Sequence, residues 1–324
     1  MFHTKDISGS SFLLTGGAGF IGSHIVEYLL VNGAGKVRVL DSMATGSWDN
    51  VSLFRSYSQY EFIEGDIRDA ATCAVACEGI NYVSHQAALG SVPRSVKDPV
   101  TSNEVNVSGF VNMITAAKDA GVRMFVYASS SSVYGDEPNL PKTEARTGNL
   151  LSPYAVTKMT NELYAGVFAK LYGLRVAGLR YFNVFGPRQD PNGPYAAVIP
   201  LFVSGILKKE PVYINGDGAQ TRDFTFVENA VQANVRAMLT DNEAACGQVY
   251  NIAVGQNFSV SFLYSSVCDL LGADHAATYR EARAGDIHDS LADITQAKEL
   301  LGYAPTRTFL DGLATTVQYF KEMK

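Results

Sequence analysis

The chain has 324 residues, of which 47% are apolar and 18% charged, a composition that excludes a disordered or fibrous protein. Its net charge of −6 argues against a broad nucleic-acid-binding surface. Residues 1–10 are polar and no run of 18 apolar residues occurs, so we expect a soluble cytoplasmic protein with no membrane partner.

The segment 15–22 reads T-G-G-A-G-F-I-G and follows the apolar run 11–14, which predicts a strand, a glycine turn and a helix in succession. Gly16 permits the tight turn, Gly19 lets backbone N–H groups approach a pyrophosphate, and Gly22 lets the helix pack closely on the strand. This pattern predicts a dinucleotide-binding site at the N-terminus of the helix.

A second predicted strand, 37–40, is followed by Asp41, which lies 19 residues beyond Gly22. A carboxylate at this spacing accepts hydrogen bonds from the adenosine ribose hydroxyls and repels a 2′-phosphate. We therefore expect the cofactor to be NAD(H) rather than NADP(H).

Strand-like and helix-like segments then alternate along the first half of the chain. The predicted strands are 61–64, 81–85, 124–128 and 174–179, and the predicted crossover helices are 109–120 and 157–171. This order predicts an α/β fold with a Rossmann-type, doubly wound parallel sheet. The loops at 65–67, 86–88, 129–132 and 181–183 should line one crevice.

The pattern loosens after residue 186, where prolines at 187, 191, 194 and 200 interrupt any long element. We expect residues 1–186 to form the NAD-binding domain, with later segments returning to it. Residues 187–324 should mainly form a smaller, mixed α/β domain that binds the substrate.

The four cysteines, at 73, 77, 246 and 268, include no C-x-x-C pair and have no His cluster nearby. We expect neither a disulfide framework nor a metal site.

Ser152 and Pro153 are typical of a helix start, and they place Tyr154 and Lys158 one turn apart on one helix face. A lysine ammonium beside a phenol favours the phenolate and lowers the pKa of the tyrosine. Tyr154 is therefore a candidate general base.

These motifs resemble the extended short-chain dehydrogenase/reductase family. The resemblance rests on 15–22, on Tyr154 with Lys158, and on A-S-S-S-S-V-Y-G at 128–135. It extends to R-Y-F-N-V-F-G-P at 180–187, V-Y-I-N-G-D-G at 212–218, T-R-D-F at 221–224 and R-A-G-D at 283–286. Together these motifs are most similar to the nucleotide-sugar 4-epimerases, and among them to the bacterial UDP-N-acetylglucosamine 4-epimerases.

The resemblance implies that Tyr154 takes the proton from the sugar 4-hydroxyl, that Ser130 bonds the same oxygen, and that Lys158 assists. NAD⁺ takes the hydride from carbon 4, and its return to the opposite face of a 4-keto sugar inverts that carbon. The cofactor residues implied are Gly16, Gly19, Phe20, Ile21, Gly22, Asp41, Thr45, Gly46, Asp66, Ile67, Gln86, Ala87, Ala88, Ser129, Tyr154, Lys158 and Tyr181.

The resemblance also implies a UDP-sugar site. Arg222 and Arg283 should clamp the diphosphate, Tyr213 should pack on the uracil, and Asp286 should meet the ribose. The remaining substrate contacts implied are Gly90, Ser91, Ser130, Ser131, Tyr154, Asn183, Gln189, Ala197, Val198 and Ser290.

Ser290 bears on substrate choice, because related epimerases have either a bulky tyrosine or a small residue at this position. A small residue leaves room for a 2-acetamido group, so we expect UDP-GlcNAc and UDP-GalNAc to interconvert. UDP-glucose and UDP-glucuronate 4-epimerases remain alternatives, although the latter usually have Thr at the position of Asn183.

Two other classes also remain. Dehydratases and decarboxylases need an acid beside the active serine, where this chain has Ser131 and Ser132, and a catalytically silent NAD-binding protein would not need Tyr154, Lys158 and Ser130. The resemblance further implies a homodimer joined through two helices per subunit, one of them carrying Tyr154.

Overall fold

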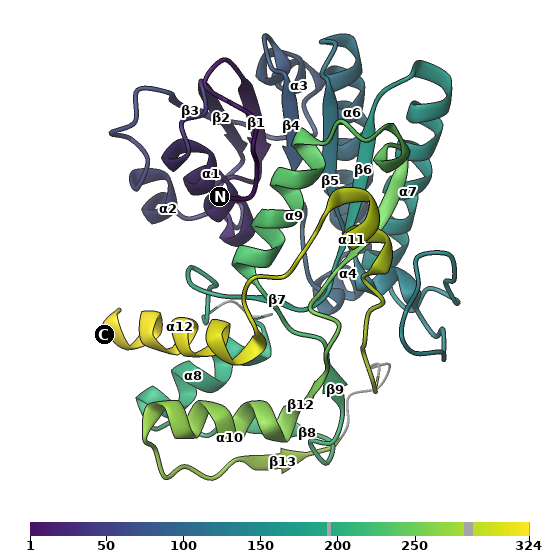
Figure 1. Cartoon of the computed structure of the whole chain (residues 1–324). Helices are drawn as coiled ribbons and strands as arrows, with labels where there is room; N and C mark the ends of the chain where they lie inside the picture. Colours follow the sequence, from purple (N-terminus) through teal and green to yellow (C-terminus); the bar gives the residue numbers. More distant parts are fainter. Residues whose placement is uncertain (193–195, 282–287, 324) are drawn as a thin grey trace.

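The computed structural model describes residues 1–192, 196–281 and 288–323. Its centre is a sheet of seven parallel strands in the order β3-β2-β1-β4-β5-β6-β11 (Figure 1). The strands are β1 (Ser11–Thr15), β2 (Lys36–Asp41), β3 (Tyr60–Glu64), β4 (Tyr82–His85), β5 (Met124–Ser130), β6 (Val176–Tyr181) and β11 (Gln248–Ile252). The order reverses between β1 and β4, which confirms the predicted Rossmann-type doubly wound sheet.

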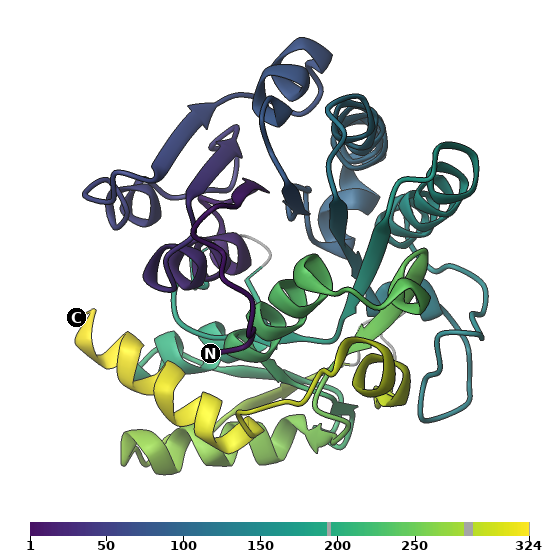
Figure 2. The same cartoon turned by 45° about the horizontal axis from the view of Figure 1, so that its top comes forward.

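Helices cover both faces of the sheet (Figure 2). One face packs on α1 (Phe20–Val31), α9 (Val227–Leu239) and α11 (Thr295–Leu301), and the other on α3 (Ala70–Cys77), α6 (Gly109–Asp119) and α7 (Pro153–Tyr172). Strand alternation explains the two layers, because Phe12 and Leu14 point into one core while Leu13 points into the other.

Two strands extend further toward their carboxyl ends than predicted. β5 continues through Ser129 and Ser130, and β6 through Arg180 and Tyr181, because these residues pair with one another across the two strands. Backbone hydrogen bonds between the strands do not depend on the polarity of the side chains. A prediction from hydrophobicity alone therefore ends these strands too early.

The predicted helix at 109–120 is the last part of a longer helical path. α5 (Pro99–Asn103) and a π-helical turn, η1 (Glu104–Ser108), lead into α6. Polar residues obscure the periodicity of these first turns. Three other short helices, α2 (Trp48–Ser52), α4 (Val92–Lys97) and the 3₁₀ turn η2 (Ser131–Tyr134), were also missed.

A separate lobe lies below the sheet in Figure 1 and has its own apolar cluster. Its helices are α8 (Val198–Lys208), α10 (Val260–Leu271) and α12 (Phe309–Glu322). Two-stranded sheets join β7 (Val184–Phe185) to β10 (Thr225–Phe226), β8 (Tyr213–Asn215) to β13 (Thr278–Arg280), and β9 (Thr221–Arg222) to β12 (Phe258–Ser259).

The chain returns from this lobe to the sheet. α9 and α11 pack on one sheet face, the 3₁₀ turn η3 (Glu243–Ala245) follows α9, and β11 pairs with β6. Residues after 186 therefore contribute to both parts of the molecule, and the division at 186 stays a prediction.

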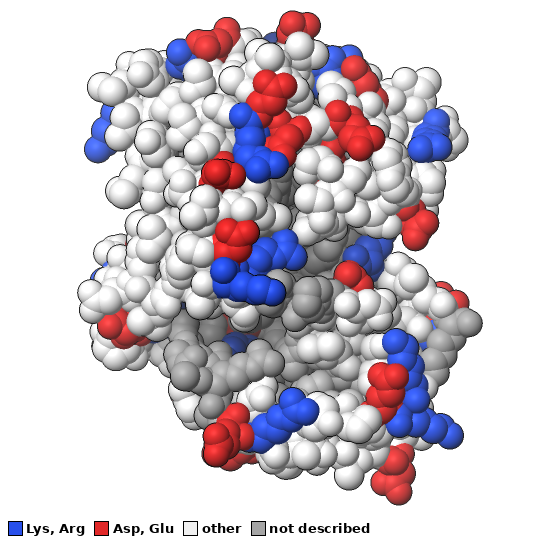
Figure 3. Space-filling view, turned by 180° about the vertical axis from the view of Figure 1, so that it is seen from behind, with Lys and Arg blue, Asp and Glu red and all other residues white. Residues whose placement is uncertain are grey.

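The surface carries charges of both signs. On the face shown in Figure 3, Lys and Arg side chains lie in small groups among Asp and Glu. Among the described residues, no helix has the length and apolar character needed to cross a bilayer.

Candidate active site

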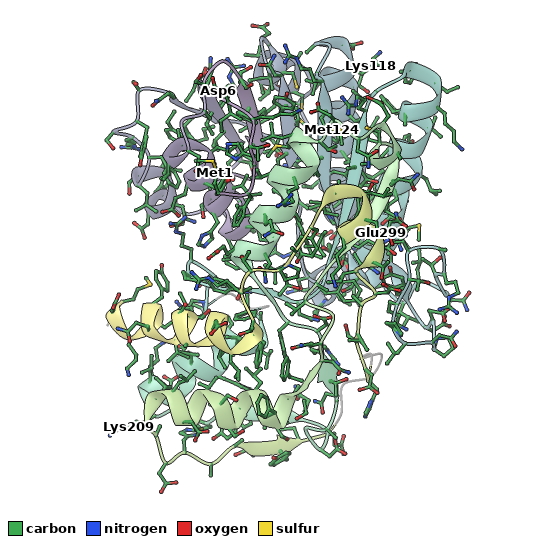
Figure 4. All side chains as sticks on the ribbon, viewed as in Figure 1. Met1, Asp6, Lys118, Met124, Lys209 and Glu299 are labelled. Atoms are coloured by element: carbon green, nitrogen blue, oxygen red, sulfur yellow. The ribbon has the colours of Figure 1, made fainter. Side chains whose placement is uncertain are left out.

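The carboxyl ends of the sheet strands face the C-terminal lobe. In Figure 4, Met124, the first residue of β5, lies far from Lys209, which follows α8 in the lobe. A cleft of about 420 Å³ opens at these strand ends. Its lining includes every predicted cofactor residue except Gly46, namely Gly16, Gly19, Phe20, Ile21, Gly22, Asp41, Thr45, Asp66, Ile67, Gln86, Ala87, Ala88, Ser129, Tyr154, Lys158 and Tyr181.

The glycine turn after β1 is too tight for side chains. Gly16 has φ +70°, and a Cβ on Gly22 would lie 2.1 Å from the Gly16 carbonyl oxygen. Gly19 is the N-cap of α1 and supplies no side-chain cap, so the first turn presents its backbone N–H groups toward the cleft. This arrangement fits a pyrophosphate at the helix N-terminus.

Asp41 lies at the end of β2 and is only 8% exposed. It accepts hydrogen bonds from the backbone N–H groups of Ala18 and Met43, each at 2.9 Å. Burial raises the pKa of Asp41, and the two N–H groups partly oppose that rise. Gly46 lines a neighbouring cavity rather than this cleft, and a Cβ there would lie 3.1 Å from the Asp41 carboxylate. Asp41 and the glycine turn together fit NAD.

Tyr154 is held near the start of α7. Ser152 caps this helix by accepting from the Ala155 N–H, and the Tyr154 N–H donates to Ser95 Oγ at 3.0 Å. One turn later, Lys158 Nζ donates to the Ala128 carbonyl at 2.8 Å and lies 5.8 Å from the centre of the Tyr154 ring.

The expected lowering of the Tyr154 pKa is wrong for this structure. Burial raises the pKa of Tyr154, and a hydrogen bond with Ser130 opposes that rise only in part. Burial also lowers the pKa of Lys158 to about 8. The sequence indicated that Tyr154 and Lys158 are neighbours, but it did not indicate that both side chains are buried.

Ser130 ends β5 beside Tyr181 of β6, so the sheet positions it directly. Its Oγ accepts the Ser132 N–H at 3.1 Å, and its side chain is hydrogen-bonded to Tyr154. Ser131 begins the turn η2. Tyr154 and Lys158 line the cleft, and Ser130 adjoins Tyr154. The catalytic roles of the three residues stay a prediction.

Two predicted hexose contacts lie after β4. Gly90 lines the cleft. Ser91 caps α4, its Oγ accepts the Arg94 N–H, and its φ of +93° is unusual for a residue with a side chain.

Several predicted substrate residues lie in the lobe. Ala197 is the N-cap of α8, and Val198 and Tyr213 line a second cavity of about 380 Å³. Arg280, which was not predicted, lines the same cavity with its guanidinium 3.1 Å from the centre of the Tyr213 ring. This contact depends on the pairing of β8 with β13, which no local pattern indicated.

Of the other predicted substrate residues, Arg222 ends β9 in the lobe, and Asn183, Gln189 and Ser290 lie in connecting segments. Asn183 Nδ2 donates to the Asp223 carbonyl, and Gln189 Nε2 donates to the Val184 carbonyl. Arg222 donates to the His288 carbonyl at 2.9 Å, while the Ser290 N–H donates to the Thr221 carbonyl. Ser290 is 9% exposed. Arg283 and Asp286 lie outside the described residues.

The four cysteines are free thiols, and Cys73 and Cys77 are buried on α3. In the ranges 1–192, 196–281 and 288–323, no group of three His, Cys, Asp or Glu side chains could hold a metal ion.

Comparison with known proteins agrees with this geometry. Residues 12–253 match the family described as "NAD dependent epimerase/dehydratase family". The chain belongs to this family. NAD is therefore its cofactor, as Asp41 and the glycine turn predicted.

Relatives in this family match nearly the whole chain. A UDP-glucose 4-epimerase of Mycolicibacterium smegmatis is 39% identical and covers 95% of this chain and 98% of the relative. The structure of UDP-N-acetylglucosamine 4-epimerase from Methanobrevibacter ruminantium, in complex with UDP-N-acetylmuramic acid, is 38% identical with a TM-score of 0.92, covering 99% and 100% of the two chains. The structure of Thermus thermophilus UDP-glucose 4-epimerase in complex with NAD is 34% identical with a TM-score of 0.85, covering 96% and 99%.

Proposed function

We propose that this protein interconverts UDP-GlcNAc and UDP-GalNAc by inverting carbon 4 of the hexose. The general activity, NAD-dependent 4-epimerisation of a UDP-sugar, follows from the family and from relatives that are similar over nearly their full length. The proposal concerns the specific sugar. The observation that supports the chemistry is that Tyr154 and Lys158 line one cleft while Ser130 interacts with Tyr154.

In the proposed reaction, Tyr154 takes the proton from the 4-hydroxyl and later returns it. Bound NAD supplies the hydride acceptor and donor at carbon 4. Ser130, which interacts with Tyr154, would bond the sugar oxygen as negative charge develops on it. The Lys158 ammonium favours the phenolate form of Tyr154, which burial by itself disfavours.

The site residues in the lobe would hold the UDP moiety. Tyr213 offers an aromatic surface in the second cavity. Arg222, which donates to the His288 carbonyl, is the proposed contact to the diphosphate. A sugar anchored there would reach across the gap between lobe and sheet toward Tyr154. Arg283 and Asp286 remain proposed contacts.

The test is incubation of the purified protein with UDP-GlcNAc without added cofactor, followed by analysis of the sugar. We expect UDP-GalNAc to form, because the glycine turn and Asp41 should retain NAD through purification. Absence of any product with UDP-GlcNAc, UDP-glucose and UDP-glucuronate would contradict an epimerase.

Replacing Tyr154 by Phe tests the proton transfer. We expect Tyr154→Phe to lose activity by about a hundredfold or more while retaining NAD, because only the phenol oxygen is removed. Tyr164→Phe, on an exposed part of the same helix, is the matched control. Full activity of Tyr154→Phe would exclude the phenol as the base.

Replacing Ser290 by Tyr tests the choice of sugar. We expect Ser290→Tyr to lose turnover of the acetylated pair and to keep turnover of UDP-glucose, because the larger ring fills the space for the 2-acetamido group. Ser290→Ala should behave like the unmodified protein. Unchanged use of UDP-GlcNAc by Ser290→Tyr would contradict the assignment, and a preference of the unmodified protein for UDP-glucose or UDP-glucuronate would favour those alternatives.

We also propose that the protein is a cytoplasmic homodimer. Helix α7 carries exposed apolar residues on the side away from the sheet: Val156, Leu163, Val167 and Leu171. Val96 and Val100 are exposed on α4 and α5, which contact α7. Pairing of these surfaces between two copies would bury them.

A further inference from the structure

The active-site helix continues its polar face one turn beyond Lys158. Tyr154, Lys158 and Glu162 follow one another at intervals of four residues on α7, so they lie on one helix face. Lys158 is 3% exposed, and the Glu162 side chain is 7% exposed. A carboxylate buried this deeply is costly unless it is paired.

Glu162 is paired from two strands. Arg180 of β6 donates to both carboxylate oxygens, Nε to Oε1 at 2.9 Å and Nη2 to Oε2 at 2.8 Å. Ser129 of β5 donates to Oε1 at 2.5 Å. One carboxylate thus joins α7 to the two strands whose ends carry Ser130 and Tyr181.

We propose that Glu162, held by Arg180, is a positioning residue of the active site that acts through Lys158. Glu162 fixes the position of α7 relative to the C-terminal end of β5, so that Lys158 reaches the Ala128 carbonyl. Its negative charge also keeps the buried Lys158 protonated. This inference rests on the proposed roles of Tyr154 and Lys158.

The charges around Lys158 support this role. On its own helix it has Tyr154 and Glu162, and the neighbouring strands present His85 from β4, Tyr127 from β5 and Arg180 from β6. Burial, and secondly Lys158, lower the pKa of His85 to about 3, so His85 is neutral. Burial raises the pKa of Tyr127, which is therefore neutral as well.

Glu162 is thus the anion within this group. Burial lowers the pKa of Lys158 to about 8, and attraction to Glu162 acts in the opposite direction. Without the carboxylate, Lys158 would lose its proton at a lower pH. Activity that needs the ammonium would then decline earlier as the pH rises.

An alternative is that the Arg180–Glu162 pair only stabilises the fold. Removing one partner of such a pair is strongly destabilising in either case, so stability does not separate the two roles. The pKa of Lys158 separates the two roles, because loss of a purely structural pair would leave this pKa unchanged.

The experiment compares Glu162→Gln with Glu162→Asp, which keeps the charge. Two quantities are measured in the NAD-loaded protein: the pH dependence of kcat with the UDP-sugar it turns over, and the titration of Lys158 by NMR of lysine-labelled protein. In Glu162→Gln we expect the pKa of Lys158, and the pH at which kcat declines on the alkaline side, both to fall by about one pH unit. At a pH above both midpoints, this corresponds to about tenfold lower kcat than in the unmodified protein. Glu162→Asp should restore both.

The matched control is Glu61→Gln, which breaks the Arg38–Glu61 pair (Nε to Oε2, 2.9 Å) between β2 and β3, away from Lys158. It should leave both measurements unchanged. Because Glu162→Gln leaves Arg180 buried without its partner and can prevent folding, Glu162→Gln/Arg180→Met is measured alongside. It removes both charges and should show a movement in the same direction but of smaller size, because loss of the Arg180 cation favours the Lys158 ammonium.

Unchanged Lys158 titration and an unchanged alkaline limb in the folded variants would overturn the inference. Tyr154→Phe, assayed in parallel, separates this failure from failure of the proposed function. If Tyr154→Phe is inactive while Glu162→Gln titrates like the unmodified protein, only the role of Glu162 is wrong. If Tyr154→Phe is fully active, the proposed catalytic roles are wrong.

Discussion

Neighbouring residues of one type have different partners in this protein. Ser129 donates to Glu162, whereas Ser130 is hydrogen-bonded to Tyr154 and accepts the Ser132 N–H. The run of four serines by itself predicts only a polar loop after a strand, whereas Ser129 and Ser130 belong to β5. The tertiary neighbours of each hydroxyl distinguish the residue nearest the reaction from the residue that supports the helix behind it.

His24 provides a test of burial at the scale of one residue. It lies on α1, and one of its ring nitrogens is 3.0 Å from the Pro187 carbonyl oxygen. Burial, and then Arg188, lower its pKa to about 4. Between pH 6.5 and 4 the unfolded chain binds a proton at His24 that the folded chain does not, so the contribution of His24 to stability falls as the pH falls.

We therefore expect His24→Gln to weaken the pH dependence of unfolding. Its free energy of unfolding should fall less steeply between pH 6.5 and 4, by up to about 1.4 kcal/mol per pH unit, because the titrating ring is gone while a side-chain amide can still reach Pro187. Urea unfolding at several pH values measures this. His288→Gln, at a side chain that is 70% exposed, is the control, and equal slopes for His24→Gln and the unmodified protein would contradict the expectation.

At the scale of elements, α7 has two different faces. One buries Lys158 against the sheet, and the other exposes apolar side chains, with Leu163 65% and Leu171 70% exposed. A soluble helix normally places polar residues on its outer face. On α7 the outer face is apolar instead, and we therefore expect a second copy of the chain to pack on this helix.

Introducing a charge on this face should separate the subunits. We expect Leu163→Glu to sediment as a monomer while the unmodified protein sediments as a dimer, because a buried, unpaired carboxylate opposes association. Val31→Glu, at an equally exposed apolar residue at the end of α1, is the control and should remain dimeric. A dimer that persists in Leu163→Glu would place the contact elsewhere.

At the scale of the whole molecule, the sheet depends on segments from both halves of the chain. Residues of α9, β11 and α11 belong to the same apolar cluster as β1, β2 and α1. The lobe is therefore built from several segments that alternate along the chain with elements of the sheet layer, and α12 follows the last of these elements.

This connectivity predicts how fragments behave. A fragment of residues 1–186 keeps α1 but lacks α9 and β11, so one sheet face is partly uncovered and β6 becomes an open edge. We expect this fragment to lack a cooperative thermal transition by circular dichroism and to retain no NAD. The full chain should unfold cooperatively and retain NAD. A fragment that unfolds cooperatively with NAD bound would support an independent domain ending at residue 186.

The cofactor and the fold class could be predicted from the sequence because their signals are local. The glycine turn, Asp41 and the Tyr154–Lys158 spacing each lie within one strand–turn–helix unit or one helix, where backbone geometry alone determines the distances. The same holds for the cap at Ser152, which marked the start of α7 correctly.

The tertiary structure decided what depends on burial and on partners distant in the chain. Arg180 meets Glu162 because β6 lies beside β5, Arg280 covers Tyr213 because β13 pairs with β8, and the pKa of Tyr154 rises because the assembled cleft excludes water. Solvent exposure and the position of a remote charge are properties of the packed chain. A local pattern of residues cannot specify them, because the same pattern can be packed against different neighbours.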